Sequence, residues 1–382
     1  MTVGPDEHYV DPRPFPPADR PDSAGLARPT GHWRLMARKF ARHRLAVISG
    51  LILLLSYASL PVAGFIAPYD PGTRHVTHIN APPQTIRLFR DGWPTAPYVY
   101  GFDVRVDLEQ FRRVYTVDRR QVYPLHMFCA GEPHHLFGVI PSTLHLFCAP
   151  EGGTVFLLGT DRLGRDVFSR LVAGAVVSLT VGLIGITISL ALGVVIGGLA
   201  GYFGGMIDHA VQRVIEIMRS IPELPLWMAL AAALPATWSP LLTYFGITII
   251  LGLLDWPSLA RAVRAKFLSL REEDYVTAAR LMGASRRRII LCHMVPNFAS
   301  HLVASATLSV PAMILGETAL SFLGLGLRPP IVSWGVMLSD AQNLAAVELH
   351  PWLLAPVIPV MVTVLAFNFL GDGLRDAADP HT

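Results

Sequence analysis

The stretch LVAGAVVSLTVGLIGITISLALGVVIGGLAGYFGGMI, Leu171–Ile207, contains no charged side chain. A helix that crosses the roughly 30 Å hydrocarbon core of a bilayer needs about 20 consecutive apolar residues, so this stretch is long enough to span a membrane. Of the 382 residues, 52% are hydrophobic and 15% are charged, against about 25% charged in ordinary globular domains. The composition therefore indicates an integral membrane protein.

Four further long stretches lack charged residues: Leu45–Tyr69, Leu224–Leu254, Asn297–Gly316 and Leu349–Gly371. The second of these lies in a longer apolar region that turn-forming residues interrupt at 235–240. We divide this region into two spans, 208–234 and 241–261, although the first carries Arg213, Glu216 and Arg219. The prediction is an all-α integral membrane protein with six transmembrane helices.

The distribution of Lys and Arg predicts the orientation, because these residues are retained on the cytoplasmic side of short loops. Every charged residue from Arg28 to Arg44 is basic, and basic residues outnumber acidic ones from Arg261 to Arg288. We therefore expect a multi-pass protein of the bacterial plasma (inner) membrane with both termini in the cytoplasm. The expected segments are a cytoplasmic tail (1–37), helix 1 (38–66), an extracytoplasmic insert (67–165), and a core (166–382) with helices 2–6 and a cytoplasmic loop at 262–294.

The insert is too long for an unstructured connection, and its sequence favours strands. Apolar and polar residues alternate in RRVYTVDRRQVY (Arg112–Tyr123). The short apolar runs PYVYGF (Pro97–Phe102) and TVFLLG (Thr154–Gly159) also favour strands. Cys129 and Cys148 would face an oxidising compartment and form either a disulfide or two free buried thiols. Four histidines lie nearby, but they do not have a recognised metal-ligand spacing, so no metal site is expected.

Common catalytic patterns are absent from the sequence. A P-loop is excluded because the only lysines are Lys39 and Lys266 and neither follows a glycine. We expect no enzyme activity and no directly bound cofactor. A net charge of +3 and the positive-inside pattern account for the arginines without nucleic-acid binding.

The segment YVTAARLMGASRRR (Tyr275–Arg288) lies between two apolar runs. On a helix, Tyr275, Ala278, Ala279 and Met282 share one narrow face of mostly small side chains. Such a short helix is unstable alone. It must dock on another protein, or be held on the membrane surface by its arginines.

The segment YVTAARLMGASRRRIILCHMVPN (Tyr275–Asn297) resembles the EAA loop of ATP-binding-cassette (ABC) importer permeases. Three further segments resemble the C-type subunits of oligopeptide and dipeptide permeases: LLGTDRLGRDVFSRLVAGAVVSL (Leu157–Leu179), AGYFGG (Ala200–Gly205) and ETALSFLGLGLRPPIVSWG (Glu317–Gly335). The resemblance covers nearly all of the chain from Leu157 onward, together with the first helix.

This resemblance implies a permease that forms half of a translocation pathway for peptides or similarly sized solutes; the alternative is the same importer class carrying oligosaccharides or opines. Its implied partners are a second permease in a heterodimer, two ABC ATPases that bind ATP and Mg²⁺, an extracytoplasmic solute-binding protein and the lipid bilayer. The EAA helix would be the coupling helix to an ATPase. The implied coupling residues are Thr277, Ala278, Ala279, Arg280, Gly283, Ala284 and Pro296; Thr277 replaces the glutamate usual in the family.

Glu317 lies close to the end of an apolar span, where an ionisable side chain must face protein or water. It would either line the pathway or a gate together with Ser321, or bond Ser321 in a structural role. We favour the structural role. A channel or receptor without ATPase partners is the alternative class.

Overall fold

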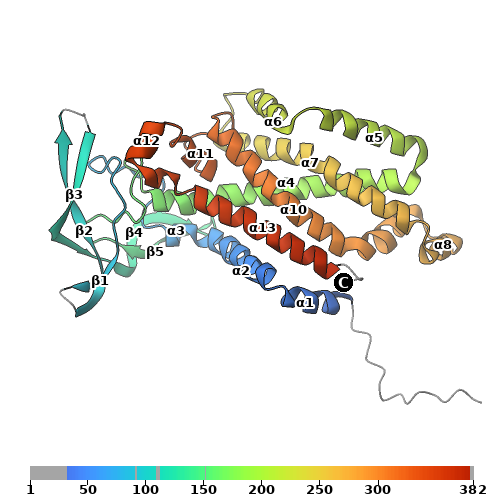
Figure 1. The fold of residues 1–382 in the computed structure, drawn as a ribbon, viewed down its shortest axis with the longest axis horizontal. Helices are drawn as coiled ribbons and strands as arrows, with labels where there is room; N and C mark the ends of the chain where they lie inside the picture. The colour runs from blue at the N-terminus through green and yellow to red at the C-terminus, as the bar shows by residue number, and fades with distance from the viewer. Residues whose placement is uncertain (1–31, 91–92, 109–111, 151, 379–382) are drawn as a thin grey trace, which may run out of the picture.

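The computed structural model describes residues 32–90, 93–108, 112–150 and 152–378. The predicted tail (1–37) lies mostly outside these residues. A helical bundle makes up most of the structure, with strands at one end (Figure 1). The long helices are α2 (Arg44–Ser59), α4 (Val167–Phe203), α7 (Pro240–Leu270), α10 (Ala299–Phe322) and α13 (Val357–Ala378). Helix α2 continues through the short turn η2 (Leu60–Val62) into α3 (Ala63–Ile66).

Shorter helices flank or connect the long ones. They are α1 (His32–Arg42), α5 (Gly205–Ser220), α6 (Glu223–Ala232), α8 (Asp274–Leu281), α9 (Arg286–Arg288), the π-helical turn η3 (Ile289–Met294), η4 (Val295–Phe298), α11 (Trp334–Ser339), α12 (Leu344–Leu349) and η5 (Pro351–Leu354).

Five helical segments among the described residues are long and apolar enough to cross a membrane: Arg44–Ile66, Val167–Phe203, Pro240–Leu270, Arg286–Phe322 and Pro351–Ala378. Each has a counterpart among the six predicted spans. The remaining prediction, one continuous helix over 208–234, is wrong. Pro222 follows Ile221, whose backbone is extended (ψ 131°), and this break separates α5 from α6.

Helix α4 is central to the bundle and packs most closely against α7. Glycines allow this contact, since a Cβ atom on Gly193 of α4 would lie 2.7 Å from Leu259 Cβ of α7. Small residues permit such close approach between membrane helices, where no hydrophobic force drives association. On its other side, Leu179 and Ile186 of α4 pack with Ile314 of α10.

The strands lie between α3 and α4 in the sequence and form two antiparallel sheets. One sheet has the order β1 (Arg87–Arg90), β2 (Trp93–Asp107), β3 (Arg112–Pro124), and the other is the hairpin of β4 (His126–Leu136) and β5 (Ile140–Cys148). β2 and β3 match the strands expected at Pro97–Phe102 and Arg112–Tyr123.

The strand expected at Thr154–Gly159 does not form. Side chains rather than a neighbouring strand satisfy much of the backbone there. The Phe156 amide donates to Gln84 Oε1 (2.6 Å), and the Val155 amide donates to the Tyr69 hydroxyl (3.0 Å). Val155 and Phe156 are fully buried, so the apolar burst reflects burial without sheet pairing.

The two ends of the bundle differ. Figure 1 shows the strands, α11 and α12 at one end and α8 at the other, with α1 and the end of α13 toward the α8 end. The insert and the connection between α10 and α13 therefore lie on the same side of the bundle, opposite the arginine-rich segment.

Candidate functional site

The α8 helix occupies the EAA-like segment and is followed by a sharp reversal at Gly283. Gly283 has φ +80°, a conformation that favours glycine. The Ala284 amide donates to Ala279 O (3.0 Å) and the Gly283 amide donates to Arg280 O (3.1 Å). These two bonds define a Schellman ending, which satisfies the last carbonyl groups of the helix. Gly283 is therefore needed for the direction in which the chain leaves α8.

One face of α8 packs against its own chain. Val276 and Ala279 are buried in a cluster with Phe267 of α7, Ile289 and Met294 of η3, and Phe298 of η4, and Ala284 packs against the same cluster. The side-chain Nδ2 of Asn297 also donates to the Tyr275 hydroxyl (2.8 Å). The prediction of a single contact face containing Ala278 and Ala279 is therefore wrong for Ala279, which faces inward. The burial also links α8 firmly to α7 and to the segment that leads into α10.

The opposite face of α8 is open. Thr277, Ala278 and Arg280 are exposed, as is Pro296 further along the chain. Leu281 is 84% exposed and Met282 81% exposed. Sequence reasoning missed Leu281 as a surface residue, because it assigned its neighbours to the small-residue face. The signal was present in the sequence, as two large apolar residues directly precede a helix-ending glycine.

The three arginines after α8 do not act as one group. Arg286 lies over the Phe203 ring at the end of α4, with its guanidinium carbon 5.5 Å from the ring centre. Ser285 caps the turn by accepting a hydrogen bond from the Arg288 amide at 3.4 Å. Arg286 therefore packs on the end of α4, while the capped turn continues the chain into η3.

Glu317 and Ser321 lie inside the bundle, where both side chains are buried. The hydroxyls of Ser321 (2.8 Å) and Ser178 of α4 (3.2 Å) donate to the Glu317 carboxylate. Ser178 Oγ accepts from the Trp334 amide (3.1 Å), and Ser321 Oγ accepts from the Leu327 amide (3.0 Å). This network joins α4, α10 and α11.

A pocket with both apolar and charged lining residues lies elsewhere, between the α5–α6 junction and α7. Its lining includes Arg219, Glu223, Trp227 and Asp255. Asp255 lies near the middle of α7 and accepts a hydrogen bond from the Ser189 hydroxyl of α4 (3.2 Å). Sequence reasoning missed this group, although a carboxylate within an apolar span is a functional signal by default.

A buried charge cluster fixes the start of α4. Asp161 accepts from the Leu163 (2.8 Å) and Arg165 (2.9 Å) amides, from Arg165 Nε (2.7 Å) and from Arg170 Nη1. Asp340, after α11, lies 3.6 Å from Arg170 Nη1. Beside the cluster, Asp166 caps α4 by accepting from the Ser169 amide (2.7 Å), and burial raises the pKa of Asp166 to about 7. The cluster ties the insert end of α4 to the segment after α11.

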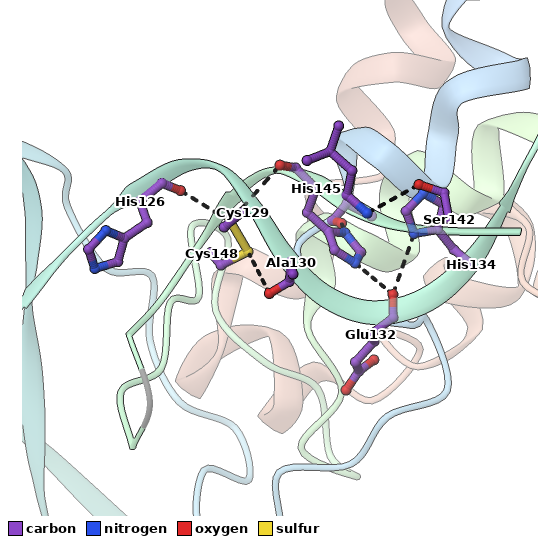
Figure 2. The surroundings of a disulfide bond; sticks show 10 residues. His126, Cys129, Ala130, Glu132, His134, Ser142, His145 and Cys148 are labelled. Atoms are coloured by element: carbon purple, nitrogen blue, oxygen red, sulfur yellow. Dashed lines mark hydrogen bonds between the residues drawn. A yellow bond between two sulfur atoms is a disulfide. The ribbon is translucent and has the colours of Figure 1, made fainter.

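Figure 2 shows the disulfide that joins Cys129 of β4 to Cys148 of β5. Nearby, each ring nitrogen of His145 lies at hydrogen-bond distance from a carbonyl oxygen, Nδ1 from Ala67 (2.5 Å) and Nε2 from Glu132 (2.8 Å). Within the described residues, no three His, Cys, Asp or Glu side chains are grouped as metal ligands.

Comparison with known proteins connects these features to a family. Residues 193–382 match the family described as binding-protein-dependent transport system inner membrane component, and residues 31–83 match the N-terminal transmembrane domain of oligopeptide transport permease C. The chain is 42% identical over 233 residues to the oligopeptide transport system permease protein of Haemophilus influenzae, covering 61% of this chain and 72% of the relative.

The chain belongs to the oligopeptide and dipeptide permease C-type family. It is accordingly an inner-membrane permease subunit of a binding-protein-dependent importer. Other relatives include the dipeptide transport system permease protein of Alkalihalophilus pseudofirmus (41% identical; 58% of this chain, 71% of the relative) and the oligopeptide transport system permease protein of Bacillus subtilis (38%; 58% and 70%).

Among solved structures, a chain of the methionine ABC transporter MetNI in an inward-facing conformation is similar, with 19% identity and a TM-score of 0.43, covering 55% of this chain and 96% of that chain. The two family matches do not include residues 84–192 of this permease, which contain all five described strands. The strands are therefore a feature of this permease outside both family matches.

Proposed function

We propose that this permease forms half of the translocation pathway for peptides or similarly sized solutes and is driven by cytoplasmic ATPases through α8. The partners in this proposal are a second permease, two ATPases that bind ATP and Mg²⁺, and an extracytoplasmic solute-binding protein. The names of the relatives support peptides as the solute class. Oligosaccharides or opines are the alternative solutes.

The observation that carries this proposal is the exposed pair Leu281 and Met282 at the end of α8. Large apolar side chains more than four-fifths exposed at the end of a helix favour burial by a partner. Burying a Leu or Met side chain contributes about 1.5–3 kcal/mol. An ATPase cleft that received both side chains would hold α8 firmly.

Movement of α8 would be transmitted to the spans by packing. Val276 and Ala279 are buried against α7 and against the turns that lead into α10. Because well-packed cores shift as units, displacement of α8 by a closing ATPase would tilt α7 and α10 together. Thr277 is exposed on α8 and lacks the charge of the usual glutamate, so coupling in this permease relies on shape and apolar contact.

The membrane arrangement in this proposal has the α8 end in the cytoplasm and the 67–165 insert outside, as the basic residues near α1 and α8 favour. In Figure 1, α5 and α6 run end to end along α7. We assign them as a sixth, broken crossing, with the break at Ile221. Broken helices are tolerated in membranes where they line a cavity, and the pocket at Asp255 adjoins this break.

We assign this pocket, rather than Glu317, to the pathway. Both oxygens of Glu317 are engaged by serine hydroxyls in the bundle interior. Asp255 is only partly buried and faces a pocket that Arg219 and Glu223 also line.

Asp255→Asn should reduce uptake with little change in Tm. The control is Glu216→Gln, in the exposed Arg213–Glu216 pair, which should change neither uptake nor Tm. A fall in Tm that accompanies the loss of uptake would instead make Asp255 structural.

The decisive experiment replaces Leu281 and Met282 with serine in the complete importer, reconstituted in nanodiscs. We expect substrate-stimulated ATP hydrolysis to fall about tenfold or more, as the loss of at least 1.4 kcal/mol of contact predicts, and ATPase subunits to co-purify poorly. The matched control is Leu291→Ser, since Leu291 is also exposed (64%) but lies on η3. Equal activity of the double variant and the control would refute coupling through this pair. Failure of the wild-type chain to co-purify with any ATPase would refute α8 as a coupling helix.

A further inference from the structure

The β4–β5 hairpin differs in charge from the other sheet. No Lys, Arg, Asp or Glu occurs between Pro133 and Pro150, whereas charged residues occur in each of β1, β2 and β3, such as Arg87, Asp103 and Arg113. Apolar side chains of the hairpin are exposed: Phe128 (64%), Phe137 (62%), Val139 (75%) and Ile140 (53%). An uncharged apolar surface of this kind marks an interaction site.

The tip of the hairpin is attached to the first membrane helix. The Phe137 amide donates a hydrogen bond to Pro61 O (2.7 Å), and Pro61 belongs to the apolar segment Arg44–Ile66. Phe128 stacks on Phe65 of the same segment, with ring centres 6.2 Å apart. Figure 1 shows the hairpin beside α3, between the helical bundle and the β1–β3 sheet.

These contacts fix the depth of the hairpin tip. At 1.5 Å per residue, Pro61 lies about 26 Å along the helix from Arg44, the last basic residue before the span. The hydrocarbon core is about 30 Å thick. With Arg44 at one boundary and the helix upright, Pro61 and the attached Phe137 lie within about 4 Å of the opposite boundary, and Phe65 with Phe128 lies at it.

The surface of α2, the helix beside the hairpin, is also apolar and uncharged. Leu51 (55%), Leu54 (65%) and Leu55 (61%) of α2 are exposed, and α2 has no charged residue after Arg44. The apolar residues of the hairpin thus continue a helix surface that requires an apolar environment. A soluble partner would instead meet the charged β1–β3 sheet.

The polar side chains of the hairpin bond within the insert and to the segment after α3. Figure 2 shows the His145 and His134 rings directed at the backbone carbonyl of Glu132, and His145 Nδ1 also lies 2.5 Å from Ala67 O. The Glu132 carboxylate accepts from the Asp70 amide (2.6 Å). Phe128 and Phe137 have φ of 53° and 55°, a conformation that bulky residues rarely adopt. The hairpin therefore holds these two residues in a backbone conformation that local preference disfavours.

We propose that the β4–β5 hairpin is a membrane-interface anchor, with Phe137, Val139 and Ile140 in contact with lipid at the outer edge of the hydrocarbon core. Its backbone remains in the headgroup layer, because the open edges of a two-stranded sheet cannot lie in hydrocarbon. Aromatic and aliphatic side chains are suited to this boundary. The anchor holds the remainder of the insert at a fixed height above the membrane.

The test is the accessibility of spin labels in the complete importer in lipid nanodiscs. Val139→Cys and Ile140→Cys are each made in a Cys292→Ser background, since Cys292 is the exposed free cysteine of the described residues and the other two form the disulfide. Val117→Cys is the control, as Val117 is also exposed (58%) but lies on β3. We expect labels at 139 and 140 to collide several-fold more with oxygen than with a water-soluble nickel chelate, and the label at 117 to show the reverse.

Two results would overturn the anchor. Nickel accessibility at 139 and 140 equal to that at 117 would place the hairpin in water. Exclusion of both oxygen and nickel would mean that a protein, such as the second permease, covers the surface. The second label position keeps the test decisive if one cysteine variant fails to assemble, because Val139 ends the hairpin turn and Ile140 begins β5, and both side chains are exposed.

Discussion

The Ser178 hydroxyl of α4 donates a hydrogen bond to the Glu317 carboxylate of α10 over 3.2 Å, and both side chains are fully buried. Ser178 also accepts the amide of Trp334, the first residue of α11. One carboxylate therefore holds three helices together through serine hydroxyls. These bonds support a structural role for Glu317.

Glu317→Ala should destabilise the permease, because it leaves the Ser178 and Ser321 hydroxyls without an acceptor. Each unpaired buried group costs about 1–3 kcal/mol, so the Tm of the purified importer should fall clearly. Glu317→Gln keeps an acceptor oxygen and should lower the Tm less. If Glu317→Gln abolished uptake at an unchanged Tm, Glu317 would belong to the pathway instead.

Gly283→Val should impair coupling through the backbone rather than through a clash. No atom lies within 4 Å of the position of an added Cβ, but φ is +80°. An L-residue in this conformation costs about 1–2 kcal/mol. Gly283→Asn is the matched control, because asparagine tolerates left-handed backbone. The ratio of solute transported to ATP hydrolysed should fall in the valine variant only; equal ratios would mean that the turn after α8 is not needed for coupling.

Asp161→Asn should destabilise the start of α4, since it leaves Arg165 and Arg170 with Asp340 as their remaining carboxylate. Breaking a buried ion pair typically costs about 3–5 kcal/mol. Arg162→Ala is the control, because the Arg162 side chain is 68% exposed in its pair with Asp340 and exposed pairs contribute about 0–1 kcal/mol. Thermal unfolding of the purified importer separates the two cases, and similar Tm values for both variants would contradict a stabilising cluster.

Replacing Cys129 and Cys148 with serine should loosen the β4–β5 hairpin. The two cysteines are 19 residues apart, and closing a loop of about this size stabilises by about 3 kcal/mol in the chain-entropy description. Limited proteolysis should then cut the insert faster than in the wild type, while Cys292→Ser should behave as the wild type. Unchanged cleavage of the double variant would show that hairpin pairing alone holds the segment.

The membrane-spanning helices and their approximate residue ranges were predictable from local sequence. Uncharged runs such as Leu171–Ile207 must form helices in lipid, because every backbone group has to be satisfied within the segment. The break at Ile221–Pro222 was missed because the region was divided at 235–240 alone, although Pro222, with Arg219 and Glu223 close by, is itself a helix-boundary signal. The strand at Arg112–Tyr123 was predicted from alternation and the strand at Pro97–Phe102 from an apolar burst.

The candidate site was located by sequence but not oriented by it. The spacing in YVTAARLMG indicates a short helix and its end at Gly283, because φ above zero favours glycine. The spacing could not determine that Ala279 packs inward or that Leu281 and Met282 remain exposed, since this depends on how α8 packs on α7 and η3.

The sequence by itself determined a bilayer-spanning chain with a glycine-terminated helix between two spans. Only tertiary packing decided the faces of α8, the partners of Glu317 and the pocket at Asp255, because each of these depends on contacts between residues far apart in the chain.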